Sequence, residues 1–104
     1  MTIIHNKLVR DRIPEIIEQS GKTCAIRILP EHEYLAALDA KLQEELNEYQ
    51  ADKSMEELAD LLEVMMAVAE ARGHSFAEVD AIRREKAAKR GGFQERIFLE
   101  SVTE

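Results

Sequence analysis

Apolar residues along the middle of the chain recur at helical spacing in two adjacent stretches. Between Pro30 and Ala51 they recur at steps of three and four, which predicts a long helix with one apolar stripe. A second stretch begins at Ser54, which together with Glu57 matches the capping box S-x-x-E, and it ends at Gly73. The two helices would form a hairpin. Their stripe residues are Leu35, Leu38, Leu42, Leu46 and Tyr49 in the first helix, and Leu58, Leu61, Leu62, Met65, Val68 and Ala69 in the second.

Two shorter helices are predicted on either side of this hairpin. Residues 8–19 favour a first helix, which Gly21 ends. Ser75 and Glu78 repeat the capping-box pattern, so a last helix begins there. It runs to Gly91, because the glycine pair at this point permits the backbone conformations of a helix end.

Two short segments outside the helices have the β-rich pattern of strands. Residues 24–29 (CAIRIL) alternate around two isoleucines, and residues 96–100 (RIFLE) form a second such run. We expect the two segments to pair with each other. The sequence therefore predicts one all-α domain over residues 1–104, a helical bundle with a small two-stranded accessory β element.

Composition limits the partners of this domain. The net charge of -7 argues against a nucleic-acid polymer, because phosphate backbones attract basic surfaces. Cys24 is the only cysteine, which favours a reducing compartment. We find neither a signal peptide nor an apolar run long enough to span a bilayer. We therefore expect a soluble, cytoplasmic protein with no membrane partner.

Four acidic residues stand in mirror order about the hairpin turn. Glu45 and Glu48 precede the turn, and Glu57 and Asp60 follow it, each pair at three-residue spacing on one helix face. Carboxylates converging between packed helices repel one another, and a hard divalent cation with oxygen ligands reverses that repulsion. The pattern predicts a site for Mg²⁺, or for Mn²⁺, at the hairpin. The alternative is a solvated acidic face.

Glu44 is a fifth carboxylate in the same region, one helical turn before Glu48. Beside a metal held by the other four, it could orient or deprotonate a water molecule. The alternative is an ordinary surface glutamate.

Cationic residues complement the acidic hairpin at both ends of the chain. Arg83, Lys86 and Arg90 recur at steps of three and four on the last predicted helix. Near the N-terminus, a smaller basic cluster contains Lys7, Arg10 and Arg12. The alternatives are a helix C-terminus that complements its own dipole and a plain surface cluster. Cations beside a divalent metal suit polyphosphates, because Mg²⁺ bridges phosphate oxygens while Lys and Arg neutralise the others.

These motifs resemble a known family. EELNE followed by EELAD is similar to the ExxE…ExxD signature of MazG-like and phosphoribosyl-ATP-pyrophosphohydrolase-like proteins, the all-α nucleoside triphosphate pyrophosphohydrolases. The opening NKLVRDRIPEII and the closing KAAKRGGFQERIFL resemble a small single-domain branch, so the likeness covers nearly the whole chain. Only eight residues separate Glu48 from Glu57, fewer than in many MazG-like proteins, and a tighter hairpin is expected.

The resemblance implies Mg²⁺-dependent hydrolysis between the α and β phosphates of a nucleotide, in a homodimer or homotetramer. By motif position, Glu44 would assist the water or a second metal. The implied metal ligands are Glu45, Glu48, Glu57 and Asp60, and the implied phosphate contacts are Lys86 and Arg90, with Lys7 and Arg10 as further candidates.

Two other functions remain open at this point. Phosphoribosyl-ATP, an intermediate of histidine synthesis, is an alternative substrate within the same enzyme class. A nucleotide-binding or oligomerisation module without catalysis is an alternative from another class, and such a module has no need of a water-activating base such as Glu44.

Overall fold

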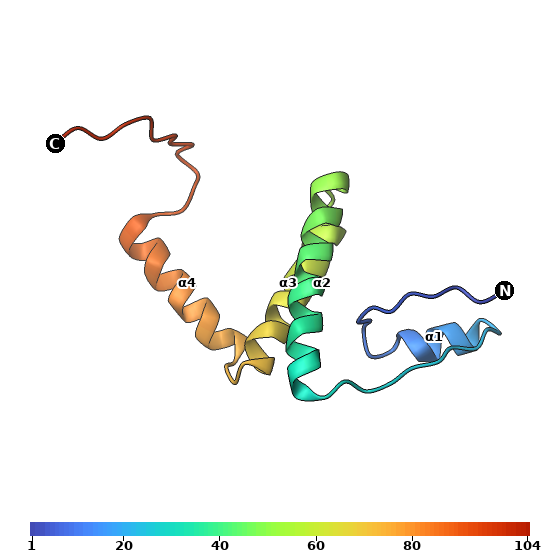
Figure 1. Ribbon diagram of the computed structural model, residues 1–104. Helices are drawn as coiled ribbons and strands as arrows, with labels where there is room; N and C mark the ends of the chain where they lie inside the picture. Colours follow the sequence, from blue (N-terminus) through green and yellow to red (C-terminus); the bar gives the residue numbers. More distant parts are fainter.

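Four helices make up the ordered secondary structure of the computed structural model, which describes all 104 residues. The helices are α1 (Ile13–Gln19), α2 (Glu31–Asp52), α3 (Met55–Ala71) and α4 (Phe76–Arg90). The predicted all-helical character is confirmed (Figure 1). None of these helices combines the length and the apolar character that a membrane span requires.

The predicted hairpin is present, and α2 packs lengthwise on α3 (Figure 1). Its turn is tight because Lys53 adopts a left-handed backbone, with φ of 61°, directly after α2. Ser54 then begins α3 as predicted: its Oγ accepts a hydrogen bond from the Glu57 backbone N–H at 3.2 Å. This cap satisfies one of the N–H groups that a helix start leaves without a partner. The short turn keeps the acidic residues on either side of it close together.

The second predicted capping box is also present, at the start of α4. The Oγ of Ser75 accepts from the Glu78 N–H at 3.1 Å, and the Glu78 carboxylate accepts from the Ser75 N–H at 3.5 Å. His74 contacts the same carboxylate at 2.8 Å, and this hydrogen bond, with that from Ser75, lowers the pKa of Glu78. α4 ends at Gly91, whose φ of 85° is one that glycine adopts without strain.

The expected two-stranded β element is not shown, since residues 24–29 and 96–100 form no strand. Figure 1 gives the reason: the first segment lies beside α1 at one end of the molecule, and the second lies beyond α4 at the other end. A strand needs the backbone of a neighbour to accept and donate its hydrogen bonds. Ile28 and Phe98, one in each segment, are each 87 % exposed.

The core of a single chain is small. Four residues are buried, namely Leu38, Val64, Ala69 and the charged Glu45, and all four lie on α2 or α3. The radius of gyration is 18.5 Å, whereas a compact domain of this length has about 13 Å. The hairpin is therefore the one packed unit of the chain, and α4 diverges from it (Figure 1).

Candidate metal centre

Carboxylates from both helices of the hairpin meet at the seam between α2 and α3. One oxygen each from Glu45, Glu57 and Asp60 lies within 4.8 Å of the others, and Glu44, Glu45 and Glu48 form a second such group. Glu45 belongs to both groups. The hairpin thus gathers all four predicted metal ligands and Glu44 around one central side chain, and three-residue spacing places each pair on one face of its helix.

Glu45 is the most enclosed charged residue of the protein, at 6 % exposure. Glu44, Glu57 and Asp60 are half-buried, and Glu48 is exposed. The Oε2 atoms of Glu45 and Glu57 are buried and have no hydrogen-bond partner.

Burying a carboxylate oxygen without a hydrogen-bond partner costs free energy, because the oxygen loses its contacts with water and no protein donor replaces them. A cation among these oxygens would remove that cost. The donor set is all oxygen and strongly negative, which are the properties that Mg²⁺ requires of its ligands. The residues present therefore fit a hard divalent cation.

Lys41 supplies part of the missing positive charge, and it is not among the residues predicted from the sequence. Its Nζ lies 3.1 Å from Glu45 Oε1 and 3.5 Å from Glu44 Oε1, and its side chain is only 16 % exposed. Burial acts to lower the pKa of Lys41, but the hydrogen bond to Glu45 and the charges of both glutamates outweigh it and raise the pKa. The spacing could have revealed it, since Lys41 precedes these glutamates by three and four residues.

The N-terminal cations reach the same seam. Lys7 Nζ lies 3.3 Å from Glu44 Oε1, and Arg10 donates to Asp60 Oδ1 at 2.7 Å. Both cations are exposed and both carboxylates are half-buried, and ion pairs in contact with solvent contribute only about 0–1 kcal/mol. They can therefore exchange partners readily. Lys7 and Arg10, in the segment before α1, lie beside the carboxylates and could therefore bind an anionic ligand at the seam.

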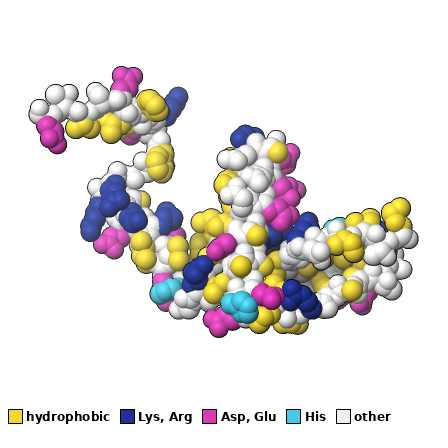
Figure 2. Space-filling view, in the orientation of Figure 1, with side chains coloured by type: hydrophobic (Ala, Val, Ile, Leu, Met, Phe, Trp, Pro, Cys, Tyr) yellow, Lys and Arg dark blue, Asp and Glu magenta, His cyan; other side chains and the backbone are white.

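The predicted cations of α4 lie elsewhere in this chain. Arg83 donates to Asp80 at 2.7 Å on its own helix, and this bond, together with that from Arg84, lowers the pKa of Asp80. Lys86 and Arg90 form no ion pair and line a shallow hollow of 220 Å³ on α4 itself. Figure 2 shows that Lys and Arg side chains gather at the end of α4 farthest from the hairpin. The single chain does not bring them to the acidic seam.

Comparison with known proteins assigns no family. No family model matches the chain, and no solved structure matches it. An uncharacterized protein of Mycolicibacterium smegmatis is 62 % identical over 45 residues, which are 43 % of this chain and 46 % of that protein. The match thus spans less than half of the relative's length. The likeness to MazG-like proteins stays a prediction that rests on the motifs.

Proposed function

We propose that this protein is a Mg²⁺-dependent nucleotide pyrophosphohydrolase. Water attacks the α-phosphorus of a nucleoside triphosphate or a related nucleotide, a new P–O bond forms, and the bond from the α-phosphorus to the bridging oxygen breaks. The products are a nucleoside monophosphate and pyrophosphate. The observation that carries the proposal is the position of Glu45, which is buried, shared by both carboxylate groups, and has one oxygen without a partner.

Glu45, Glu57 and Asp60 would hold the cation, and Glu48 would complete the set from the exposed side. When bound, Mg²⁺ supplies positive charge that offsets the phosphates and lowers the pKa of water. Mn²⁺ offers the same chemistry with the same oxygen ligands. Lys41 holds the other oxygen of Glu45, so it fixes the orientation of this carboxylate.

Glu44 is the proposed general base. It is half-buried, and in the structure both Lys7 and Lys41 contact its Oε1. An ionised carboxylate at this position would accept a proton from the attacking water. Lys7 and Arg10 would also contact the substrate, because a cation in the seam would release them to bind phosphate oxygens.

Lys86, Arg90 and Arg83 are proposed as further substrate contacts. Because α4 diverges from the hairpin of its own chain, these cations would act on a nucleotide held by another copy (Figure 1). A homodimer or homotetramer would provide that second copy. The unpaired segments 24–29 and 96–100 could likewise form the accessory β element only between chains.

A panel of nucleotides with pyrophosphate detection tests the proposal. We expect Mg²⁺-dependent release of pyrophosphate from at least one nucleoside triphosphate, and phosphoribosyl-ATP belongs in the same panel as the alternative substrate. Glu48→Gln should abolish turnover while the helical circular dichroism signal persists. Full activity in this variant would reject the ligand assignment.

Glu44→Gln separates an enzyme from a module that only binds nucleotide. Loss of a general base lowers the rate by about 10²–10⁴-fold, whereas binding of Mg²⁺ and nucleotide should persist as a rise in melting temperature. If no nucleotide is cleaved by the unaltered protein but the thermal shift is present, the binding module is the better assignment. A nucleotide substrate would also place the protein in the cytoplasm, as the single cysteine suggests.

A further inference from the structure

The five carboxylates at the seam divide into two groups that share Glu45. Glu44, Glu45 and Glu48 all lie on α2, and we refer to them as the α2 group. Glu45, Glu57 and Asp60 come from both helices, and we refer to them as the hairpin group. No other part of the chain brings three or more acidic, histidine or cysteine side chains close enough to share a cation. The seam thus offers positions for one divalent cation or for two.

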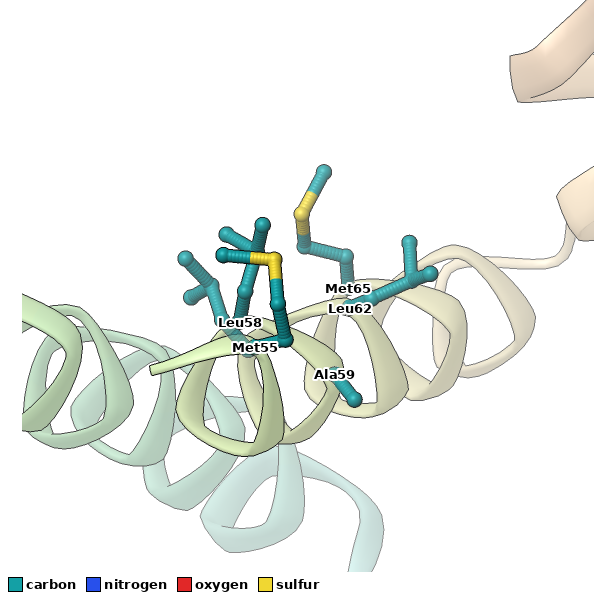
Figure 3. A pocket seen from close by; sticks show the side chains of 6 residues that line it. Met55, Leu58, Ala59, Leu62 and Met65 are labelled. Atoms are coloured by element: carbon teal, nitrogen blue, oxygen red, sulfur yellow. The ribbon is translucent and has the colours of Figure 1, made fainter. Parts of the chain in front are cut away.

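The apolar hollow of α3 adds no further position for a cation. It has a volume of 400 Å³ and is lined by six hydrophobic residues. Figure 3 shows Met55, Leu58 and Met65 of this hollow projecting from α3 on the side away from α2. A hard cation requires oxygen ligands, which these side chains lack. Divalent cations are therefore restricted to the seam.

The two groups differ in how far their charge is already neutralised. In the α2 group, Lys41 Nζ lies 3.1 Å from Glu45 Oε1 and 3.5 Å from Glu44 Oε1. Lys7 Nζ lies 3.3 Å from the same oxygen of Glu44. In the hairpin group, the Oε2 atoms of Glu45 and Glu57 are buried and have no hydrogen-bond partner. The missing positive charge therefore belongs to the hairpin group.

Lys41 is held in the α2 group more firmly than Lys7. Its side chain is 16 % exposed, and it lies three and four residues before its two glutamates on the same helix. Lys7 is 45 % exposed and comes from the segment before α1, which has no regular secondary structure. A buried charge that leaves its partners loses their compensation for its desolvation. Lys41 therefore stays in the α2 group when a ligand arrives, whereas Lys7 can leave.

The charges at the seam match one divalent cation. The five carboxylates face three cationic side chains, those of Lys41, Lys7 and Arg10. The two negative charges that remain equal the charge of one Mg²⁺ or Mn²⁺. A second divalent cation in the α2 group would compete with Lys41 for the Oε1 atoms of Glu44 and Glu45, and the nearby ammonium would repel it.

We propose that the seam binds a single divalent cation, in the hairpin group, and that the ammonium of Lys41 takes the place of a second one. Lys41 is thus a positioning residue that sets the number of metal ions. The inference rests on the cation site of the proposed function and adds its stoichiometry. It also decides between the two roles open to Glu44, because a carboxylate bound to Lys41 is not the ligand of a second metal. Glu44 then remains available to accept a proton from water.

Titration with Mn²⁺, followed by electron paramagnetic resonance, tests the stoichiometry without nucleotide or turnover. The signal of the free ion decreases when Mn²⁺ binds to protein, so bound ions can be counted. We expect one tightly bound Mn²⁺ per unaltered chain. Lys41→Ala should bind a second ion, because it frees oxygens of Glu44 and Glu45. The two ions should then couple magnetically, since two-metal sites hold their ions roughly 3.5–4 Å apart.

Two variants serve as controls for Lys41→Ala. Lys41→Arg keeps a positive charge in the α2 group and should still bind one Mn²⁺, which a role in packing alone would not require. Lys89→Ala removes a lysine that pairs with Glu85 at the same four-residue spacing on α4, and it should also leave the count at one. A second ion in Lys89→Ala would show that loss of any lysine raises the count, and would overturn the proposal.

Glu44→Gln keeps the proposal falsifiable if Lys41→Ala fails to fold. It should still bind one Mn²⁺, whereas a Glu44 that held a second metal would make the count fall from two to one. Two ions in the unaltered chain, or one ion in folded Lys41→Ala, overturn this proposal and leave the enzymatic one intact. If one Mn²⁺ binds as expected but no nucleotide is cleaved, the enzymatic proposal alone fails. If no Mn²⁺ binds, both proposals are wrong.

Discussion

The acidic seam of the hairpin and the charged surface of α4 hold their ionised groups in different ways. On α4, Arg83 and Arg84 bind Asp80, and Lys89 binds Glu85, all at spacings of three or four residues on one helix. At the seam, carboxylates from two helices converge, and two of their oxygens stay buried without a partner. Pairs within one helix stabilise that helix, whereas buried carboxylate oxygens without partners are costly until a cation binds them. The contrast predicts that a bound cation stabilises the seam more than it stabilises the paired charges around Asp80.

Among the substitutions that test this comparison, Glu57→Gln should have the largest effect on activity. Activity should fall by more than about 100-fold, because even supporting groups around a metal commonly contribute 10–100-fold. The metal-free protein should unfold no more easily, because the change removes a charge from a crowded seam whose Glu57 oxygen has no partner to lose. The unaltered protein should gain about 2.7 kcal/mol of unfolding free energy at a Mg²⁺–nucleotide concentration of 100 times Kd. Chemical denaturation in the presence of a chelator measures the stability of the metal-free proteins, and denaturation with Mg²⁺ and nucleotide measures the gain. Pyrophosphate release measures the activity.

Asp80→Asn is the matched control for that experiment. It removes a carboxylate that is paired on its own helix, so the gain from Mg²⁺ and nucleotide should remain. If Asp80→Asn lost as much of the stabilisation by Mg²⁺ and nucleotide as Glu57→Gln does, the seam and α4 would not differ in function.

The second prediction concerns the distance between the two regions. If the α4 cations act on a nucleotide held by another copy, a Glu48→Gln chain and a Lys86→Ala/Arg90→Ala chain should complement each other. Random pairing in a two-fold dimer makes half the dimers mixed, each with one intact site, so about one quarter of full activity returns in the mixture and about one half in the isolated mixed dimers. Co-purification through two different affinity tags, followed by pyrophosphate detection, measures it. No recovery, with each parent inactive, would place these cations in their own chain's site.

Much of the hairpin could be predicted from the sequence because its signals are local. Ser54 and Ser75 each form the cap that the S-x-x-E pattern indicated, and the three-residue spacing of the acidic pairs places them at one seam. Lys41 was missed even though its spacing to Glu44 and Glu45 is equally local. A lone lysine within an acidic helix is inconspicuous, because a functional cation is usually sought where several cluster.

Contacts that depend on the arrangement of distant segments were harder to predict. The segments 24–29 and 96–100 each have a strand pattern, but the pattern does not determine whether one chain brings them together, and this chain does not. The same holds for Lys86 and Arg90: α4 forms as predicted, but their helical spacing does not determine the direction in which α4 leaves the hairpin. Local spacing sets the elements, and burial between elements sets their arrangement.

The third prediction tests the role of Lys41 in the seam. Its raised pKa means that the folded state favours the charged amine, so its contribution to stability is complete below the usual lysine pKa and is lost as pH rises through the higher folded value. Lys41→Met should therefore destabilise the protein at pH 8 by about 1.5 kcal/mol, the lower end of the range for a hydrogen bond to a charged group. The difference from the unaltered protein should shrink as pH rises above about 10.5. Urea unfolding at several pH values measures this, and a constant difference would contradict it.

The smallest effect is expected at the start of α4, where His74 binds the Glu78 carboxylate in full contact with solvent. The lowered pKa of Glu78 means that its contribution is present above the usual glutamate pKa and is lost as pH falls through the lower folded value. His74→Ala should therefore lower the melting temperature slightly near pH 6 and have no effect in strong acid, where Glu78 is neutral in both proteins. It should also leave the stabilisation by Mg²⁺ and nucleotide unchanged, because neither residue belongs to the carboxylate groups at the seam. If His74→Ala instead reduced that stabilisation as much as Glu57→Gln does, the result would contradict the distinction between paired carboxylates and the unpartnered carboxylate oxygens at the seam.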